Sequence, residues 1–300
     1  MRQQFMFLPV LNYRDGYGVT YGVRTSFVDA FGTRSRASVP LTWGATKRAA
    51  LEVDKTLRAG WVRRLEGGVS IAEEENPHFR VDDRRVRLWG RVERILAHNM
   101  RLGGQAAWHV VDFDDLDERF VSYGTDLTFD TRIDQTFPRD AVYAAAGWEG
   151  LRFDAWPTVQ RGWIDARGDV GLIRQSVLSV RARYDIASRA LPPYQQPLLG
   201  GASTLRGFRA GTFVGDNLMA ASVELRLPTT SPLATGRAGV TLFWDAGAAY
   251  AHGERLRDAP VHHGAGAGLF LLAPPFRLNV DVAYGFDERV RLHVMTGFAF

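Results

Sequence analysis

Apolar and polar residues alternate with a period of two along most of this chain. Residues 276–285 show the pattern clearly, with Val280 and Val282 in an apolar row and Asp281 in a polar row. Successive side chains of a strand point to opposite faces of its sheet, so one face of this strand is apolar and the other is hydrophilic. Residues 175–187 repeat the pattern.

Each alternating segment is about as long as a tilted strand that crosses a bilayer, roughly 9–11 residues. Sixteen such segments can be counted, and bacterial outer-membrane barrels have an even number of strands. We therefore predict an all-β fold, a sixteen-stranded antiparallel transmembrane β-barrel formed by residues 1–300 as one domain. The predicted strands are 4–13, 17–28, 33–44, 47–58, 60–72, 83–96, 99–112, 121–131, 140–152, 157–169, 175–187, 216–227, 237–251, 261–273, 275–286 and 289–300.

A soluble β-sandwich produces the same alternation, because its apolar faces meet in a core and its polar faces reach water. In this chain Gly, Ala and opposite charges share the polar faces. Such faces suit a crowded barrel interior, where Arg pairs with Asp or Glu on a neighbouring strand. We therefore expect the apolar face to contact lipid. A soluble all-β binding protein is the alternative, and it would refold without detergent.

Composition narrows the class of protein further. Hydrophobic residues make up 46% of the chain, yet no run approaches the roughly 18 apolar residues that a membrane-spanning helix needs. The formal net charge of +4 is spread along the chain, which argues against nucleic-acid binding. The first sixteen residues lack the apolar core of a signal peptide. We therefore expect a mature form, a domain of a longer protein or an incomplete gene product.

Residues 188–215 are the longest stretch without alternation and are predicted to form a long loop. The loop contains Leu205, Arg206, Gly207 and Phe208 after a Pro-Leu-Leu-Gly-Gly run, and residues 243–247 read Phe243, Trp244, Asp245, Ala246 and Gly247. These motifs resemble the BamA/TamA-type bacterial surface antigen superfamily, in which a [VIL]-R-G-[FY] loop tip is tucked back into the barrel. The segments 129–132 and 136–139 resemble the D-x-R and F-P element of the same family.

Parity within the strands gives the loop motif a physical role. Glu224 and Asp245 fall on the polar faces of their strands, so both should face the barrel lumen. Arg206 would supply the opposite charge, because a guanidinium in a partly dehydrated lumen is tolerable only when it is paired. We predict that the loop folds into the lumen as an internal brace. The alternative is an ordinary Gly-rich surface loop.

The carboxyl terminus resembles the assembly signal of outer-membrane proteins. An alternating segment ends the chain on an aromatic residue, and the signal is expected at Phe298 and Phe300. Catalytic motifs such as G-x-S-x-G, H-E-x-x-H and the Walker loop do not occur in the sequence, and the chain has no Cys. We therefore expect no enzymatic activity, no cofactor and no metal site.

The family resemblance implies an outer-membrane protein that inserts or translocates polypeptide through a weakly closed seam between its first and last strands. The expected partners are outer-membrane lipid and lipopolysaccharide, unfolded or secreted polypeptide, and the outer-membrane assembly machinery during biogenesis. The transport-associated domains that precede such barrels are not expected in this chain. Two other interpretations stay open, namely the barrel of a patatin-like esterase fusion and a stand-alone surface antigen or passive pore.

Overall fold

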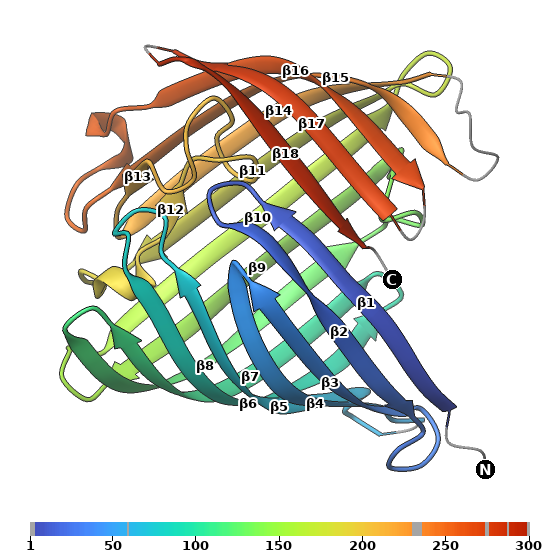
Figure 1. The fold of residues 1–300 in the computed structure, drawn as a ribbon, viewed down its shortest axis with the longest axis vertical. Helices are drawn as coiled ribbons and strands as arrows, with labels where there is room; N and C mark the ends of the chain where they lie inside the picture. The colour runs from blue at the N-terminus through green and yellow to red at the C-terminus, as the bar shows by residue number, and fades with distance from the viewer. Residues whose placement is uncertain (1–3, 59, 230–235, 274–275, 287, 299–300) are drawn as a thin grey trace.

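The structure, a computed structural model, describes residues 4–58, 60–229, 236–273, 276–286 and 288–298. Within these residues sixteen antiparallel strands form one closed barrel (Figure 1). Each barrel strand pairs with the next one along the chain, and the first strand pairs with the last. The predicted all-β fold and the predicted number of barrel strands are confirmed.

The barrel strands are β1 (Gln4–Arg14), β2 (Gly18–Val28), β3 (Ser35–Gly44), β4 (Thr46–Thr56), β5 (Arg64–Glu75), β6 (Asp82–Ala97), β7 (Met100–Phe113), β8 (Leu116–Asp130), β9 (Ala141–Phe153), β10 (Val159–Gly171), β11 (Val177–Ala187), β14 (Asn217–Thr229), β15 (Arg237–Tyr250), β16 (His262–Ala273), β17 (Phe276–Gly285) and β18 (Val290–Phe298). Smaller elements are the 3-10 turns η1 (Pro193–Gln195) and η2 (Leu256–Asp258) and the short strands β12 (Leu198–Leu199) and β13 (Phe213–Val214). No helix among the described residues is long and apolar enough to cross a membrane.

The barrel strands begin and end within four residues of the predicted positions, except at the start of β8. This strand begins at Leu116, five residues before the predicted start at residue 121. The prediction missed this end because Asp117 and Arg119 occupy exposed positions of the alternation, where apolar side chains were expected. The pairing of β12 with β13 inside the long loop was not predicted either.

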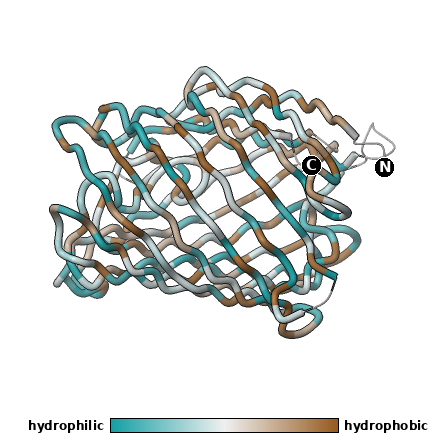
Figure 2. The backbone as a smooth tube through the Cα atoms, turned by 90° about the horizontal axis from the view of Figure 1, so that it is seen from below, coloured by the Kyte–Doolittle hydropathy of each residue, from teal (hydrophilic) through white to brown (hydrophobic). Residues whose placement is uncertain are grey.

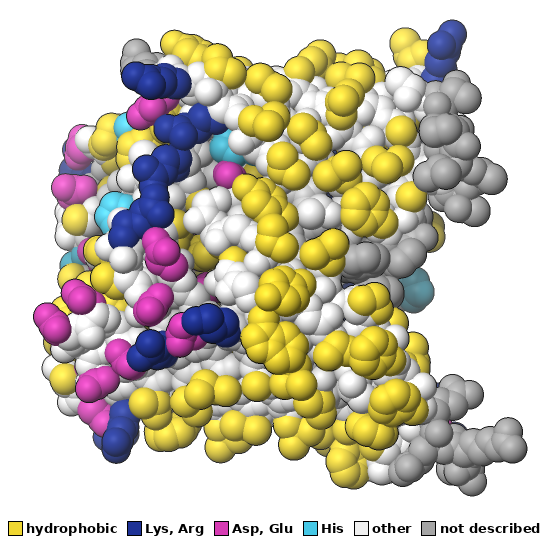
Figure 3. Space-filling view, in the orientation of Figure 1, with side chains coloured by type: hydrophobic (Ala, Val, Ile, Leu, Met, Phe, Trp, Pro, Cys, Tyr) yellow, Lys and Arg dark blue, Asp and Glu magenta, His cyan; other side chains and the backbone are white. Residues whose placement is uncertain are grey.

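Apolar side chains cover the outside of the barrel. Leu88 in β6 and Val282 in β17 are 56% and 51% exposed, whereas Asp281, next to Val282, is 3% exposed. Figure 2 shows hydrophobic and hydrophilic positions alternating along the tilted strands. Figure 3 shows a wide belt of hydrophobic side chains, with charged side chains gathered at one end of the barrel. Such a belt is typical of a barrel in lipid, whereas a soluble sandwich would bury these rows between its sheets.

The inner face of the barrel carries charges that pair between strands, from β10 to the adjacent β11 and from β6 past β7 to β8. A guanidinium nitrogen of Arg91 lies 2.5 Å from a carboxylate oxygen of Asp126, and Arg181 contacts Asp165 at 2.7 Å. Pairs of opposite charge on adjacent strands stabilise a sheet, and they also satisfy the donors that the interior would otherwise leave without partners.

The turn between β8 and β9 reaches across one end of the barrel. Asp130 accepts hydrogen bonds from the backbone and the guanidinium of Arg132 at 2.9–3.0 Å. Further along the turn, Phe137 is buried and packs against Phe270 of β16, with ring centroids 5.8 Å apart. The D-x-R and F-P element therefore shapes this turn and ties it to a strand far from β8 and β9 in the barrel order.

The seam between β1 and β18 is short. Tyr13 and Thr296 are the one Cα pair between these strands among the described residues, whereas β1 pairs with β2 over its full length. In the same register Phe298, where β18 ends, falls opposite Leu11. Residues 4–10 therefore have no partner strand on this side within the described part of the chain, and Figure 1 shows β18 ending part-way along β1.

A charge on the outer face tests whether that face contacts lipid. We expect Leu88→Arg to lower the free energy of unfolding by roughly 2–4 kcal/mol, the cost of an arginine near the middle of a bilayer on a barrel surface. The measurement is urea unfolding in phospholipid vesicles, followed by tryptophan fluorescence. Leu88→Met is the control, because it replaces the side chain without adding charge. Equal stability of the two variants would contradict a lipid-facing Leu88.

Candidate functional site

The connection between β11 and β14 is anchored near its start by a buried apolar cluster. Leu191 and Tyr194 pack with Phe120 and Phe153, which belong to β8 and β9. The backbone carbonyl of Tyr194 accepts a hydrogen bond of 2.6 Å from the guanidinium of Arg85 on β6. Burial raises the pKa of the Tyr194 hydroxyl above its ordinary value, because the charged form is poorly solvated there. The connection therefore starts from a fixed position against the barrel wall.

The loop tip, residues 205–208, is held by its two apolar side chains. Leu205 and Phe208 are 0% and 2% exposed and pack with Leu199 and Leu218. Between them, Gly207 has a φ of +94°, and a Cβ at this position would come within 2.3 Å of the backbone nitrogen of residue 285. Both the backbone conformation and the close approach require glycine.

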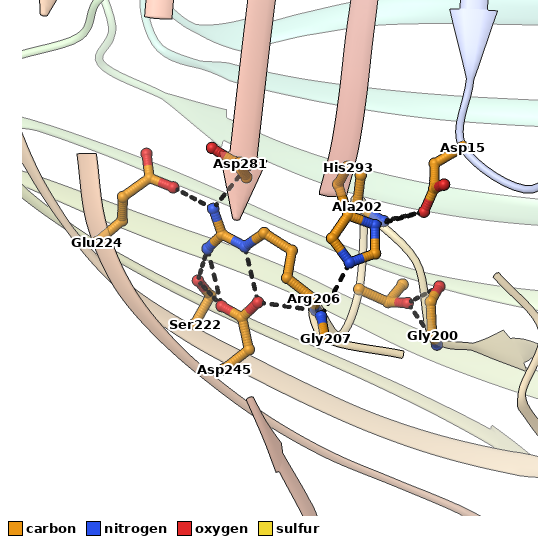
Figure 4. Close-up of polar contacts among 11 residues, drawn as sticks. Asp15, Gly200, Ala202, Arg206, Gly207, Ser222, Glu224, Asp245, Asp281 and His293 are labelled. Carbon is orange, nitrogen blue, oxygen red and sulfur yellow. Dashed lines mark hydrogen bonds and ion pairs between the residues drawn. The ribbon is translucent and has the colours of Figure 1, made fainter. Parts of the chain in front are cut away.

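Arg206 binds two carboxylates that project from neighbouring strands (Figure 4). Its Nε and one terminal nitrogen each donate to Asp245 of β15 at 2.8 Å, and its backbone N–H donates to the same carboxylate at 3.0 Å. Its other terminal nitrogen donates to Glu224 of β14 at 2.8 Å. This is the two-point geometry in which a guanidinium recognises a carboxylate most strongly.

Further groups surround the same guanidinium. Asp281 of β17 lies 3.5 Å away, and the hydroxyl of Ser222 accepts a hydrogen bond of 3.1 Å. The guanidinium carbon lies 3.4 Å from the ring centroid of Phe243, which adds a cation–π contact. Arg206 therefore touches three strands, and its side chain is only 8% exposed.

The electrostatics of the site favour a charged Arg206. Burial by itself lowers the pKa of this guanidinium, but the hydrogen bonds that it donates to Asp245 and the charges of Asp245 and Glu224 outweigh burial and raise the pKa. Arg226 also pairs with Glu224, at 2.7 Å. Three carboxylates thus face two guanidiniums, and loss of Arg206 would leave a strong excess of negative charge in a buried place.

A second set of contacts links the loop to both edges of the seam. The backbone N–H of Gly207 donates to Nε2 of His293 on β18 at 2.9 Å, and Nδ1 of His293 lies 2.6 Å from Asp15 in the β1–β2 turn. The backbone N–H of Ala202 also reaches Asp15, at 3.3 Å. Because Nε2 accepts a hydrogen bond, Nδ1 carries the hydrogen and donates it to the carboxylate. We call Asp15, Ala202, Gly207 and His293 the seam clasp (Figure 4).

Some of the site residues predicted from the sequence lie together in the structure, and others lie apart. It brings Arg206 together with Glu224, Asp245 and Phe243, and it buries Leu205 and Phe208 beside them. Gly247 leaves room for Leu199, whose Cδ1 would lie 2.7 Å from a Cβ there.

Other predicted site residues lie elsewhere. Trp244 is 44% exposed on the outer face and takes no part in the contacts of Arg206. Phe298 ends β18, at the seam. Phe300, the other residue of the predicted assembly signal, lies outside the described residues.

Sequence reasoning missed four residues of this site, namely Asp15, Ser222, Asp281 and His293. Strand parity put Asp281 on an inward face, but nothing in the sequence connected it to the loop tip. His293 and Asp15 lie 278 positions apart, so only the closed barrel brings them together. No group of His, Asp or Glu side chains suited to a metal ion is found in the part of the chain that the structure describes.

Comparison with known proteins identifies the type of barrel. A family model described as "Omp85 superfamily domain" matches residues 16–300. The crystal structure of BamA from Haemophilus ducreyi lacking POTRA domains 1–3 is similar, with a TM-score of 0.82 and 15% sequence identity over 100% of this chain and 71% of that chain. Among curated proteins, none is similar enough in sequence to count as a relative.

Two further solved structures are also similar. CdiB from Escherichia coli matches with a TM-score of 0.72 and 14% identity, and CdiB from Acinetobacter baumannii with 0.67 and 12%. These matches cover 100% and 99% of this chain but only 63% and 59% of the CdiB chains. At such low identity the likeness concerns the fold.

Removing the guanidinium should destabilise the barrel. We expect Arg206→Ala to lower the free energy of unfolding by roughly 3–5 kcal/mol, because it leaves buried carboxylates without a counter-charge. The measurement is gel electrophoresis of samples heated to increasing temperatures, which gives the temperature at which the band of the compact, folded barrel is lost. Arg181→Ala is the matched control, since Arg181 is 43% exposed and its pair with Asp165 should contribute only about 0–1 kcal/mol. Equal melting of both variants would contradict the importance of Arg206.

Breaking the seam clasp should loosen the seam and leave the rest of the barrel unchanged. In His293→Phe the ring stays but both hydrogen bonds are lost, so we expect amide exchange in β1 and β18 to rise by about tenfold, the effect of roughly 1.4 kcal/mol. Hydrogen–deuterium exchange measures this, with β9 and β10 as internal references. His109→Phe is the control, because His109 lies in the barrel wall at β7, away from the seam. Unchanged exchange in β1 and β18 would show that the clasp does not hold the seam.

Proposed function

This chain belongs to the Omp85 superfamily, and we propose that it lies in the bacterial outer membrane, where it inserts barrel proteins or passes polypeptides across the membrane. The similarity of its barrel to those of BamA and CdiB supports this proposal. In this proposal the end that carries the β11–β14 connection faces the cell exterior, and no covalent chemistry is involved.

The incomplete seam is the observation that carries the proposal. Residues 4–10 of β1 expose backbone N–H and C=O groups along an edge that no described strand covers. Such an edge is a template on which another strand can add by backbone hydrogen bonds. Pro9 lies within this segment, and proline is tolerated in strands mainly at edges. An incoming polypeptide strand could therefore pair with β1 before it leaves into the lipid.

A cavity also lies beside the seam, next to residues 12–17 and beyond the free edge of β1. It has a volume of about 460 Å³ and lies between β1, β17, β18 and the long loop. Asn12 and Arg14 line it from β1, and Asn279 and Thr296 line it from β17 and β18. Its polar groups can accept the backbone of an extended segment, because amide and guanidinium groups replace water as hydrogen-bond partners.

We further propose that the loop tip acts as an internal brace for one side of the seam. Arg206 and Gly207 bind β14, β15, β17 and β18, whereas the hydrogen bonds at the opposite side of the seam, among the described residues, are accepted by Asp15. Opening the seam would therefore break the contacts of Asp15 and the short β1–β18 pairing. The wall from β14 to β18 would keep its shape while β1 moves away.

A reversible lock across the seam tests the proposal. Tyr13 and Thr296 are Cα partners, and such partners lie about 4.5–5.5 Å apart, within the range that a disulfide bridges. Because the chain contains no Cys, the variant Tyr13→Cys with Thr296→Cys carries a single engineered pair. We expect oxidation to reduce insertion of an unfolded barrel protein into liposomes by about tenfold or more, and reduction to restore it.

The matched control is Ala144→Cys with Ala166→Cys, which bridges β9 and β10 on the far side of the barrel. This bridge should leave insertion unchanged. Full activity of the oxidised seam variant would contradict the proposed route. If the protein inserts nothing but conducts ions equally well with the seam locked, it is a passive pore.

A further inference from the structure

At the end of the barrel that carries the long loop, the first strands do not extend as far as the later ones. β2, β3 and β4 have 11, 10 and 11 residues, whereas β6, β7 and β8 have 16, 14 and 15. Figure 1 shows the β1–β2 and β3–β4 turns stopping short of the β5–β6 and β17–β18 connections. We call this lower part of the rim, above β1–β4, the rim notch. Within the long loop, Ser203 and Arg209 are exposed.

An ion-pair row marks where the apolar belt ends near the rim notch. Lys47 of β4 contacts Glu73 of β5 at 2.6 Å, Glu73 contacts Arg84 of β6 at 2.9 Å, and Arg84 contacts Asp112 of β7 at 3.7 Å. These residues are Cα partners at one level of the barrel. Two positions before Glu73 in β5, Ile71 is 59% exposed. The row therefore lies where lipid chains give way to headgroups.

A basic cleft lies just above this level. It has a volume of about 440 Å³ and is bounded by the β5–β6 connection, the long loop and the β17–β18 connection. Its charged lining residues, among those described, are Arg80, Arg209, Arg291 and Glu288. Three guanidiniums thus face one carboxylate among the described lining residues, and Glu75, outside the lining, pairs with Arg80. The cleft thus combines an anion-binding character with a position at the membrane surface.

The guanidiniums of the cleft are incompletely paired. Arg209 is exposed and forms no ion pair with the described residues. Nε of Arg291 is buried without a hydrogen-bond partner in the same part of the chain, and Arg291 reaches Glu288 only at 3.8 Å. Arg80 contacts Glu75 at 3.2 Å, but both side chains are more than half exposed, so water screens the pair. Donors are therefore available for an anionic group.

The walls of the cleft are fixed by contacts that do not involve these guanidiniums. Nδ1 of His78 donates to the backbone carbonyl of Gly211 at 2.7 Å, which ties the β5–β6 connection to the long loop. A Cβ on Gly211 would lie 3.1 Å from the backbone nitrogen of His78, so the two segments are in close contact. The carboxamide of Asn76 accepts from the backbone N–H of His78 at 3.0 Å and shapes this turn. The cleft is therefore preformed.

We propose that this cleft binds the phosphate group of a lipid in the outer leaflet, with Arg209 as the principal ligand and Arg80 and Arg291 at its sides. Guanidinium forks match phosphate oxygens in pairs, and such charge-assisted bonds are stronger than neutral ones. The low rim gives a lipid headgroup access from the side, while its acyl chains rest on the belt below the ion-pair row. The cleft adjoins the cavity beside the seam, with which it shares Ala210 and Gly211, but lipid binding to it can be measured without an insertion assay.

The experiment measures lipid binding to the full chain in detergent by native mass spectrometry. The probes are doubly phosphorylated lipid A, lipid A from which both phosphates have been removed, and inorganic phosphate. Wild-type protein should retain phosphorylated lipid A and lose it as salt concentration rises. Arg209→Gln should weaken this binding by about tenfold or more, the loss expected for one charge-assisted hydrogen bond. Dephosphorylated lipid A should bind equally weakly to both proteins.

The matched control is Arg189→Gln, which removes an exposed arginine from the same loop but outside the cleft. It should bind lipid A as the wild type does. Arg80→Gln serves as a second cleft variant. Wild-type affinity in both Arg209→Gln and Arg80→Gln would overturn the proposal. So would displacement of lipid A by inorganic phosphate at equal concentration, because the cleft would then be a site for free phosphate.

Discussion

Within a bilayer, every backbone N–H and C=O group of a strand needs a partner from another strand, because lipid offers none. This requirement makes the sheet close on itself, and it explains why the strand order returns from β18 to β1. Among the described strands, the seam between β1 and β18 satisfies this requirement for backbone pairing only in part, since a single Cα pair joins the two edges. At the end of the seam away from the unpaired residues 4–10, Asp15 accepts hydrogen bonds from His293 and from the long loop.

The partly dehydrated interior of the barrel also limits where a charged side chain can be buried. The buried guanidinium of Arg206 is stable there only because carboxylates from several strands surround it. Those carboxylates in turn require the guanidinium, so the loop and the wall from β14 to β18 stabilise each other. Contacts to the opposite edge depend on Asp15, which receives hydrogen bonds from His293 and Ala202. The molecule therefore has one firmly braced wall and one lightly attached edge.

Much of this architecture could be predicted from the sequence because strand alternation is a local property. The number of barrel strands, the apolar outer face and the inward orientation of Glu224 and Asp245 all follow from parity. The start of β8 could not be predicted, since Asp117 and Arg119 are charged yet exposed on the outer surface beyond the belt. Inward and outward side chains still alternate there, but the outward ones are charged because this strand end extends beyond the lipid.

Contacts between distant segments were also beyond local reasoning. The motif around Arg206 pointed to two carboxylates, but the third, Asp281, and the histidine of β18 were found only in the folded barrel. The basic cleft combines three connections that are far apart in the sequence, and none of its arginines belongs to a motif recognised in the sequence. Only the strand register and the unequal strand lengths bring them to one place.

The spacing of the seam clasp has a consequence for the order of folding. His293 and Asp15 are 278 positions apart, and Arg206 is 75 positions from Asp281. Contacts between such distant positions require large loops to close, so they form late. The loop tip can complete its bonds only after the last strands have joined the sheet and the two ends of the chain have met. Docking of Arg206 and Gly207 is therefore a final step of maturation, and it separates a finished barrel from an open sheet of nearly the same strand content.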